Sequence, residues 1–296
     1  MSNGKKILWS LLGVYVGGLV VLLVIFGITT HKNSEFAPQN EFKLTNWVHL
    51  GVFSINRAVV YLFIAAVLTV FTMVYIAKRM QARPNRVQTA VETLFSLMRD
   101  NITRGNMDAR MAAKWFPYIG ALFLFIWYCN LIGYLPLPTN SGEKFHIFGA
   151  AIPTFALYAA TANVSVPLIL ALISFVAFNW EGIRVHGPFG YVKSLIPAGV
   201  SGPILLLIAP LEVISTFMRL VSLTVRLFAN ILAGHLIILF MAGGLAIIIG
   251  ASWIGWGLLP IGVLIYLFEL GLVATLQAFI FATLSAIYLG GAVSHH

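Results

Sequence analysis

Six long apolar runs limit what this chain can fold into. Each is long enough to cross a hydrocarbon core of about 30 Å, which takes ~20 helical residues. The runs cover residues 7–28, 53–77, 115–137, 153–178, 198–244 and 245–290. Only 9% of the residues are charged, against about 25% in a typical soluble domain. The sequence therefore predicts an all-α, polytopic membrane protein with about six membrane helices, folded as a single integral domain over residues 1–296 in the lipid bilayer.

The basic residues lie in the short segments between the apolar runs. Lys5 and Lys6 precede the first run, the richest basic segment (residues 78–86) follows the second, and a basic loop (residues 179–195) follows the fourth. The loops on the opposite side carry fewer basic residues, as the positive-inside rule expects. This asymmetry predicts a multi-pass protein of the cell inner (plasma) membrane with both termini cytoplasmic, an organelle membrane being the alternative. The net charge of +9 reflects the same pattern and predicts no nucleic-acid partner.

Two N-terminal segments need separate interpretation. The run 7–28 is longer than a typical signal-peptide core and no small-x-small cleavage site follows it, so an extra N-terminal span is favoured over a cleaved signal. Residues 78–114 are expected to form a cytoplasmic segment. Within it, residues 87–104 place apolar residues at helical spacing among charges, which indicates an amphipathic helix at the membrane surface or a simple linker helix.

The last two runs are too long for upright helices. As continuous helix the run 198–244 would measure about 70 Å, and the part after Pro210 alone would measure about 51 Å. Fitting ~51 Å into a ~30 Å core requires a tilt beyond about 50°, outside the usual range of ~0–40°. The run 245–290 has the same excess length, with Pro260 as a bend point. We therefore expect residues 198–290 to form a pair of long, strongly tilted helices.

Four charged residues stand inside these two runs: Glu212, Arg219, Arg226 and Glu269. An ionisable group at the middle of a membrane helix costs at least ~2.5–3.5 kcal/mol and usually marks an ion or substrate path. The first three recur every seven residues and share a helix face, but good ion pairs within a helix stand three or four residues apart. Arg226 therefore needs a partner on another element or another protein. Two buried salt bridges that hold the fold are the structural alternative.

Polar residues accompany these charges. Asn230 follows Arg226 by four residues, Gln277 lies deep in the last run, and Asn163 interrupts the fourth. Histidine and glutamate side chains can exchange protons, so together with His235 and Glu269 these residues could form a wet polar track on either side of the arginine. Singly, each is more often a hydrogen bond between helices than the lining of a channel.

Two other function classes find less support in the sequence. A secondary transporter with an anionic substrate near Arg219 and Arg226 should show an internal repeat or paired broken helices, and neither is present. An intramembrane enzyme should show a serine–histidine or paired-aspartate arrangement, but the histidines are scattered and the single cysteine, Cys129, lies in an apolar run. No catalytic residue, cofactor or metal site is predicted.

Four segments of the chain resemble one family. The segment PLEVISTFMRLVSLTVRLFANILAGHLIILFMAGG is similar to the arginine signature of subunit a of F-type ATP synthases, and LFELGLVATLQAFIFATLSAIYL is similar to its last helix. FLFIWYCNLIGYLPLP resembles its third span, and GPFGYVKSLIP resembles its loop. The resemblance covers about residues 50–290, and a chance match of all four segments in this order is improbable.

The resemblance implies a stator that faces a rotating ring of c subunits, each with one carboxylate at mid-membrane. In the family, two aqueous half-channels reach the ring, and the arginine that matches Arg226 keeps the ring carboxylate ionised and separates the half-channels. Asn163 would lie near the entrance of the outer path, and Glu212 and Arg219 would serve the cytoplasmic exit or the structure. The outer path itself would be lined by Glu269, His235, Asn230 and Gln277.

The same resemblance implies partners and shows three departures. The implied partners are the c-subunit ring, the peripheral-stalk b subunits and the catalytic head, and the subunit itself would move protons without catalysis. Leu220 stands where a proline usually follows the first arginine, and Asn163 stands where a carboxylate is common. Glu269 precedes Gln277 by eight residues, one more than in the family. Selectivity for H⁺ or Na⁺ would be decided mainly by the carboxylate site of the ring.

Overall fold

The computed structural model of the chain describes residues 13–18, 20–21, 46–50, 53–79, 85–135, 144–147, 150–153, 159–194, 204–249 and 252–293. The chain divides into two compact units. The first unit comprises residues 1–43 and 233–271, and the second comprises residues 44–232 and 272–296. This division leaves the single membrane domain over 1–296 as a prediction.

Helices make up most of both units. Within the described residues, five helices are long and apolar enough to cross a membrane. They are Ala58–Lys78, Ala109–Gly133, Ser165–Tyr191, Leu207–Leu239 and Gly257–Val293. They correspond to five of the predicted runs, so the fold class is confirmed as an all-α polytopic membrane protein. Of the run 7–28, residues 13–18 and 20–21 are helical, and the rest of that predicted span lies outside the described residues.

The second unit begins with a hairpin and two helices. β1 (Asn46–Leu50) pairs antiparallel with β2 (Phe53–Asn56), and α2 (Arg57–Arg79) follows directly. α3 (Arg86–Ser96) continues as a π-helical stretch, Leu97–Arg104. These helical turns cover the segment for which the sequence predicts an amphipathic helix. Its location on the cytoplasmic side stays a prediction.

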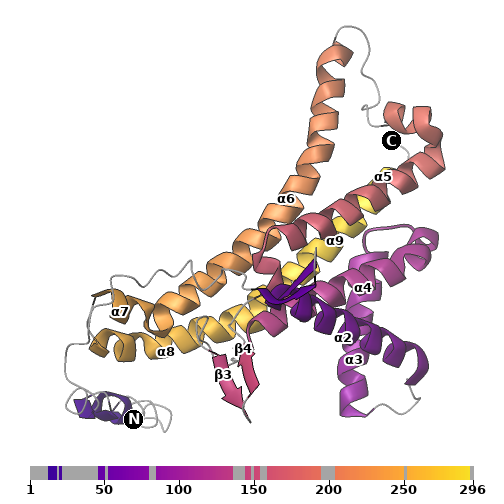
Figure 1. Ribbon diagram of the computed structural model, residues 1–296. Helices are drawn as coiled ribbons and strands as arrows, with labels where there is room; N and C mark the ends of the chain where they lie inside the picture. The colour runs from indigo at the N-terminus through magenta and orange to yellow at the C-terminus, as the bar shows by residue number, and fades with distance from the viewer. Residues whose placement is uncertain are drawn as a thin grey trace, which may run out of the picture. The chain divides into compact units, whose positions relative to one another are not determined.

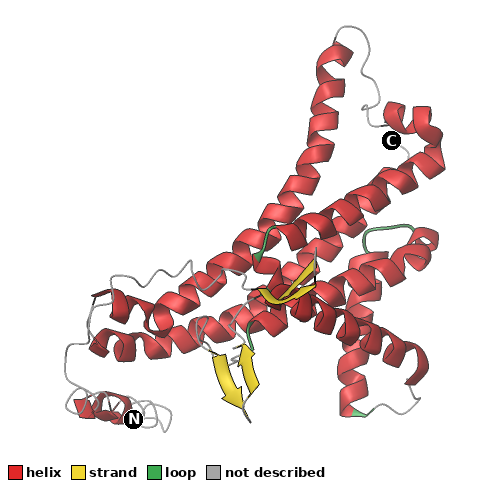
Figure 2. Cartoon of the chain, viewed as in Figure 1, coloured by secondary structure: helices red, strands yellow, loops and turns green. Residues whose placement is uncertain are grey.

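A second hairpin separates the next two helices. α4 (Ala109–Gly133) is followed by β3 (Lys144–Ile147) and β4 (Ala150–Pro153), which pair antiparallel. Figure 2 shows both hairpins in yellow beside the helices. A single 3₁₀ turn, Ala160–Ala162, leads into α5 (Ser165–Ser194). The strands are the exception to the all-helical prediction. β2 occupies the start of the predicted run 53–77, because apolar composition alone does not separate a short strand from the start of a helix.

α5 differs from the predicted limits of the fourth span. The helix begins at Ser165, where the Asn163 side chain accepts a hydrogen bond from the Ser165 backbone N–H at 3.0 Å. It then continues past residue 178 through the segment that the sequence predicts as a loop. Within that extension Gly187 has a positive φ of 73° and is followed by Pro188, which together mark a kink.

The core of the second unit forms around α4. This helix packs on α2 and α9 (Ala274–Val293), and α9 also packs on α5, as Figure 1 shows. Phe123 of α4 and Phe281 of α9 are buried in one hydrophobic cluster with residues of the other helices. Of an 18-residue apolar stretch in each helix, 56% is buried in α4 but only 17% in α2. α2 therefore leaves most of its apolar surface uncovered within the unit.

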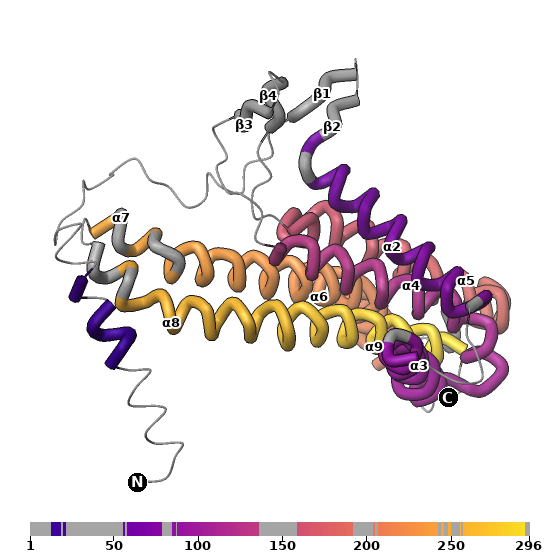
Figure 3. The backbone as a smooth tube through the Cα atoms, turned by 90° about the horizontal axis from the view of Figure 1, so that it is seen from below, coloured from indigo at the N-terminus to yellow at the C-terminus, as the bar shows by residue number. Residues whose placement is uncertain are grey.

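The first unit contains the end of α6 (Leu205–Leu239) and a helical hairpin after it. A π-helical turn, Phe240–Gly244, leads into α7 (Leu245–Ile249), and α8 (Ser252–Phe268) packs back on both. Figure 3 shows α7 and α8 side by side. The Tyr15 hydroxyl donates to the Gly257 carbonyl at 3.3 Å, so the described N-terminal helical residues attach to α8.

The last two spans are long, as predicted. α6 has 35 residues, which is about 52 Å of helix. The span Gly257–Val293 has 37 residues, about 55 Å, and contains a π-helical turn at Glu269–Val273. Residues 198–203 of the predicted run lie outside the described residues. The strong tilt follows from these lengths by the argument given above and stays a prediction.

Candidate functional site

Within the second unit, α6 has one buried and one exposed face. Leu223, Leu227 and Ile231 belong to the core cluster. The opposite side presents large apolar side chains that are about half exposed, namely Ile214, Met218, Val221 and Val225. We call this side the exposed α6 face. Side chains of this type suit lipid or a partner protein, and they set the environment of the polar residues among them.

Arg226 lies on the flank of α6, between the buried face and the exposed α6 face. Its side chain is exposed, and Asn230, one helical turn further on, is exposed as well. Among the described residues, neither the Arg226 guanidinium nor the Asn230 amide has a hydrogen bond or an ion pair. An uncompensated charge at mid-membrane costs at least ~2.5–3.5 kcal/mol. Arg226 is therefore placed where an anionic partner from outside the described chain would stabilise it.

Arg219 has partners within the second unit. Its Nη2 lies 3.8 Å from Oε1 of Glu212, with the two side chains 33% and 29% exposed. Its Cζ lies 5.1 Å from the ring centroid of Tyr288 on α9. The seven-residue spacing argues against this ion pair, and for Glu212 and Arg219 that expectation is wrong, because the two long side chains extend toward each other along the helix. The separation exceeds a hydrogen-bond length, so the contact is loose.

The two predicted proton-exchanging residues belong to the first unit, and both are buried. His235 on α6 is 1% exposed, and Glu269 is 8% exposed. Glu269 is the first residue of the π-helical turn Glu269–Val273. Such turns are rare and frequently mark functional sites, and a buried carboxyl group in a membrane helix is a functional candidate by default. Glu269 thus combines a buried carboxyl group with a place in a π-helical turn.

Gln277 lies on α9 in the second unit. The residue is 6% exposed, and its amide has no hydrogen-bond partner among the described residues. The amide atoms are not among the fully buried, unpaired atoms of the described residues, so they keep some access to their surroundings. Gln277 therefore fits a hydrated position better than a hydrogen bond that holds two helices together.

Asn130 of α4 is a buried polar residue that the sequence analysis missed. Its Nδ2 donates to the Ala274 carbonyl at the start of α9 at 3.1 Å, and its Oδ1 accepts a hydrogen bond from the Thr161 hydroxyl at 2.8 Å. Asn130 and Thr161 are both fully buried. The side chain therefore fixes the helix that carries Gln277. The available signal was an amide residue in the middle of the apolar run FLFIWYCNLIG.

Asn163 has a structural role at the start of α5. The residue is half-buried, and its Oδ1 accepts the Ser165 backbone N–H, one of the donors that the first helical turn leaves unpaired. Its predicted place at a channel entrance stays a prediction.

A charged pair that the sequence analysis also missed joins α4 and α5. Lys114 donates a hydrogen bond to Glu181, whose side chain is only 4% exposed. Further along these helices, Ser174 of α5 bonds to the Tyr118 hydroxyl of α4 at 2.8 Å. Glu181 falls in the segment predicted as a loop, which is why its burial was not foreseen. Within the described residues, no three His, Cys, Asp or Glu side chains gather as a metal ion would require.

Comparisons with known proteins match the same part of the chain. The sequence model of a family described as ATP synthase A chain matches residues 59–290. A Rubrobacter xylanophilus protein named ATP synthase subunit a is 36% identical over 250 residues, which cover 82% of this chain and 88% of that protein. A Rhizobium rhizogenes protein of the same name is 33% identical over 263 residues, which cover 86% and 96%. A third, from Anaeromyxobacter dehalogenans, is 34% identical over 244 residues, and the match spans 81% of this chain but 58% of that longer protein.

Proposed function

Because the chain belongs to the ATP synthase A chain family, we propose that it is the stator subunit of the membrane sector of an F-type ATP synthase, with half-channels that give protons access to a ring of c subunits. The chain is a multi-pass membrane protein that serves ATP synthesis and proton transport. In this proposal proton flow drives rotation of the ring, and Arg226 separates the two half-channels. The subunit translocates protons and is not itself catalytic.

The exposure of Arg226 is the observation that carries the proposal. A guanidinium effectively never loses its proton, so it cannot escape the cost of an apolar environment by becoming neutral. Glu212 does not supply its counter-charge, since that carboxylate lies against Arg219. A carboxylate that a c subunit presents to the exposed flank of α6 would pair with Arg226 and stay ionised while it does so. The arginine would then block direct proton passage along the face.

The access path on the outer side is proposed to use four side chains. Arg226 and Asn230 stand four residues apart on α6, and both are exposed. The path residues are Glu269, His235, Asn230 and Gln277, with Asn163 near the entrance and Glu212 and Arg219 near the exit or in a structural role. The burial of Glu269 and Gln277 supports this assignment, because buried ionisable or unpaired polar groups in membrane helices commonly mark ion paths.

The π-helical turn bears on the unusual spacing of Glu269. This residue stands eight positions before Gln277, one more than in the family resemblance. A π-helical turn closes i→i+5 hydrogen bonds and so accommodates one residue more than an α-helical turn. The turn Glu269–Val273 lies within this interval, which supports the family role for Glu269 despite the longer spacing.

The lengths of the last two spans support contact with a ring. Helices of about 52 and 55 Å exceed a ~30 Å hydrocarbon core by a wide margin. We propose that both lie strongly tilted and follow the curved side of the c ring. The peripheral-stalk b subunits and the catalytic head are the further proposed partners. The proposed location is the cell inner membrane, with both termini in the cytoplasm.

Proton pumping tests the proposal directly. We would measure ATP-driven pumping in inverted membrane vesicles that carry Arg226→Ala. Arg184→Ala is the matched control, because Arg184 is an exposed arginine of α5 outside the proposed path. Assembly of the complex is verified in both strains by purification of the intact enzyme.

The expected result is a loss of pumping of roughly 100-fold or more in Arg226→Ala, the factor that ~2.7 kcal/mol represents, with wild-type pumping in Arg184→Ala. Pumping near the wild-type rate in an assembled Arg226→Ala complex would refute the proposal, because the arginine would then be scaffolding.

A further inference from the structure

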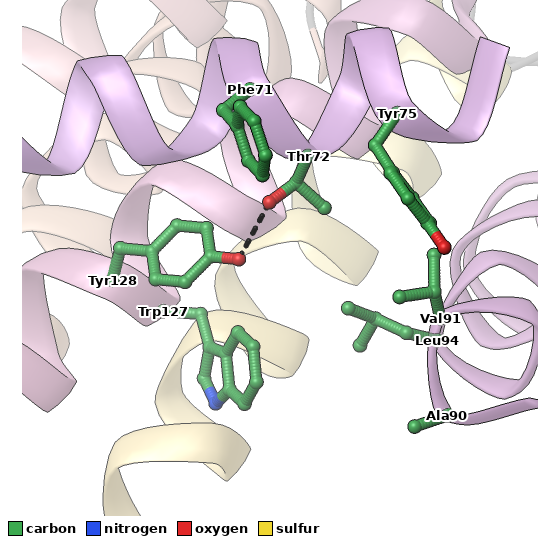
Figure 4. A pocket seen from close by; sticks show the side chains of 8 residues that line it. All are labelled: Phe71, Thr72, Tyr75, Ala90, Val91, Leu94, Trp127 and Tyr128. Carbon is green, nitrogen blue, oxygen red and sulfur yellow. Dashed lines mark hydrogen bonds between the residues drawn. The ribbon is translucent and has the colours of Figure 1, made fainter. Parts of the chain in front are cut away.

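An apolar cavity of about 360 Å³ lies in the second unit between α2, α3 and α4. Phe71 and Tyr75 of α2, Ala90 and Leu94 of α3, and Trp127 of α4 are among the side chains that line it, as Figure 4 shows. The cavity contains little polar surface, because the Thr72 and Tyr128 hydroxyls in its wall bond to each other at 2.7 Å. It falls within the ~300–1,000 Å³ range of small-molecule sites.

The cavity adjoins a second apolar hollow on the exposed face of α2. That hollow measures about 460 Å³ and is lined only by Ala66, Val67, Val70, Phe71 and Val74. Phe71 lines both spaces and is 68% exposed. An apolar chain can therefore lie along α2 and enter the space between α2 and α3. This surface belongs to a span that is only 17% buried within the protein.

Basic side chains stand at one end of the cavity. Lys78 is one turn beyond Tyr75 on α2, and Arg86 is one turn before Ala90 on α3. Spacings of three and four residues keep a side chain on the same helix face, and both basic side chains are exposed. By sequence, the chain between them contains two further basic residues, Arg79 and Arg83, and no acidic one.

The acidic residue of α3 does not cancel this charge. Glu92 stands two positions after Ala90, which is about 200° around the helix, and accepts a hydrogen bond from Gln88 on that other side. The Tyr75 hydroxyl, in contrast, has no hydrogen-bond partner among the described residues and lies between α2 and α3 (Figure 4). It supplies a polar group between the apolar cavity and the basic end.

The depth of these residues matches the layers of a lipid. Lys78 is the last residue of the membrane span Ala58–Lys78, so it belongs at the level of the headgroups. Tyr75 and Phe71 lie about 4.5 and 10.5 Å deeper along the helix, at the level of the upper acyl chain. Charge and apolar volume thus follow the order in which a phospholipid presents its phosphate and its tails.

We propose that this site binds an anionic glycerophospholipid. Its phosphate headgroup lies against Lys78 and Arg86, one acyl chain fills the cavity between α2 and α3, and the other follows the hollow on α2. Basic pockets beside membrane helices are a recurrent form of lipid headgroup recognition.

Photo-crosslinking in the purified intact complex tests the site. The probes are phosphatidylglycerol and phosphatidylcholine, each with a diazirine in the middle of one acyl chain, and the labelled peptides are mapped. The variants are a double substitution, Lys78→Gln with Arg86→Gln, and a cavity-filling substitution, Ala90→Trp. Arg184→Gln is the matched control for loss of an exposed basic residue. Proton pumping and assembly are measured in every variant, so that a failure to fold is recognised.

We expect phosphatidylglycerol to label residues 71–75 and 90–94 several-fold more than phosphatidylcholine. The double substitution should remove this preference, Ala90→Trp should lower labelling by both lipids, and Arg184→Gln should change neither. Equal labelling by the two lipids in the wild type would overturn the proposal, since the site would then hold bulk lipid only. Cross-links from this cavity to another protein chain would also overturn it and would assign the surface to a partner helix. If an assembled Ala90→Trp complex kept wild-type labelling, the chain would lie outside the cavity and the proposal would fail.

Discussion

Two arginines on α6, two helical turns apart, stand in opposite situations. Arg219 contacts Glu212 on its own helix and the ring of Tyr288 on α9. Arg226 is exposed among half-exposed apolar side chains and has no polar partner in the described part of the chain. The residue type, the helix and the helix face are shared. What differs is whether the positive charge is compensated within the protein.

The difference indicates which charge is structural and which is available to a partner. A charge compensated within the fold contributes to stability, and its removal changes the folded state first. A charge without a partner in a membrane contributes nothing to stability of the isolated chain and costs ~2.5–3.5 kcal/mol or more. Its presence therefore requires a function or a partner that the isolated chain lacks.

The largest expected effect separates the two arginines directly. Arg226→Ala should reduce ATP-driven proton pumping by roughly 100-fold or more, whereas Arg219→Ala should reduce it by no more than about tenfold and should lower the thermal stability of the complex. Vesicle pumping and thermal unfolding of the same preparations measure both quantities. If Arg219→Ala abolishes pumping with stability unchanged, the two residues belong to one path and the contrast is wrong.

Asn130 extends the comparison to a neutral group with internal partners. Asn130→Ala leaves the buried Thr161 hydroxyl without its acceptor and the Ala274 carbonyl without this donor, which should cost about 1–3 kcal/mol of stability. Pumping per folded complex should stay within about twofold, because Asn130 is not a proposed path residue and the packing of α4 on α9 remains in the variant.

Cys129→Ala is the control for this prediction, since Cys129 is the adjacent residue and is equally buried. Thermal unfolding should place Cys129→Ala near the wild type and Asn130→Ala clearly below it. A loss of pumping without a loss of stability would instead move Asn130 into the proton path.

Membrane spans were predictable from the sequence, but their limits were not. Apolar composition over ~20 residues is a local property, so five spans appear where the runs predict them. Residues 53–56 belong to the predicted run 53–77, yet they pair with residues 46–50 as a strand. The extension of α5 was missed because a charged residue such as Glu181 indicates a loop when only the sequence is known. Its burial depends on its partner Lys114 on α4. Such errors arise wherever distant contacts override local composition.

For the candidate site too, the sequence predicted the local features and missed the contacts between distant residues. Spacing along one helix was enough to predict that Arg226 lacks a partner there, because that argument needs only helix geometry. The contact between Glu212 and Arg219 depends on side-chain conformations that spacing does not determine. The bond from Asn130 to Ala274 joins residues 144 positions apart. No local pattern contains that information.

A carboxylate introduced on α6 itself should remove the difference between Arg219 and Arg226, because it would give Arg226 a partner on its own helix. Ser222 is exposed and stands four residues before Arg226, the favourable order for a glutamate–cation pair. Ser222→Glu should lower pumping roughly tenfold. That factor corresponds to about 1.4 kcal/mol, an energy between that of an exposed ion pair and that of a buried one. Ser222→Gln, which has the same size without the charge, should pump nearly as well as the wild type. Equal losses in the two variants would point to a steric effect and leave the charge argument unsupported.

The smallest effect concerns how firmly Arg219 is held. A double-mutant cycle with Glu212→Gln and Arg219→Gln, followed by thermal unfolding, should give a coupling energy below about 1 kcal/mol, because the charged atoms are 3.8 Å apart and both side chains are about one-third exposed. Because the ion pair is so weak, the contact of Arg219 with the Tyr288 ring should contribute a comparable energy to stability. Tyr288→Leu should therefore destabilise the complex by a similar amount. If the cycle gives no coupling and Tyr288→Leu has no effect, Arg219 is no better compensated than Arg226. The proposal that Arg226 separates the half-channels would then rest on its position along α6 and not on its lack of a partner.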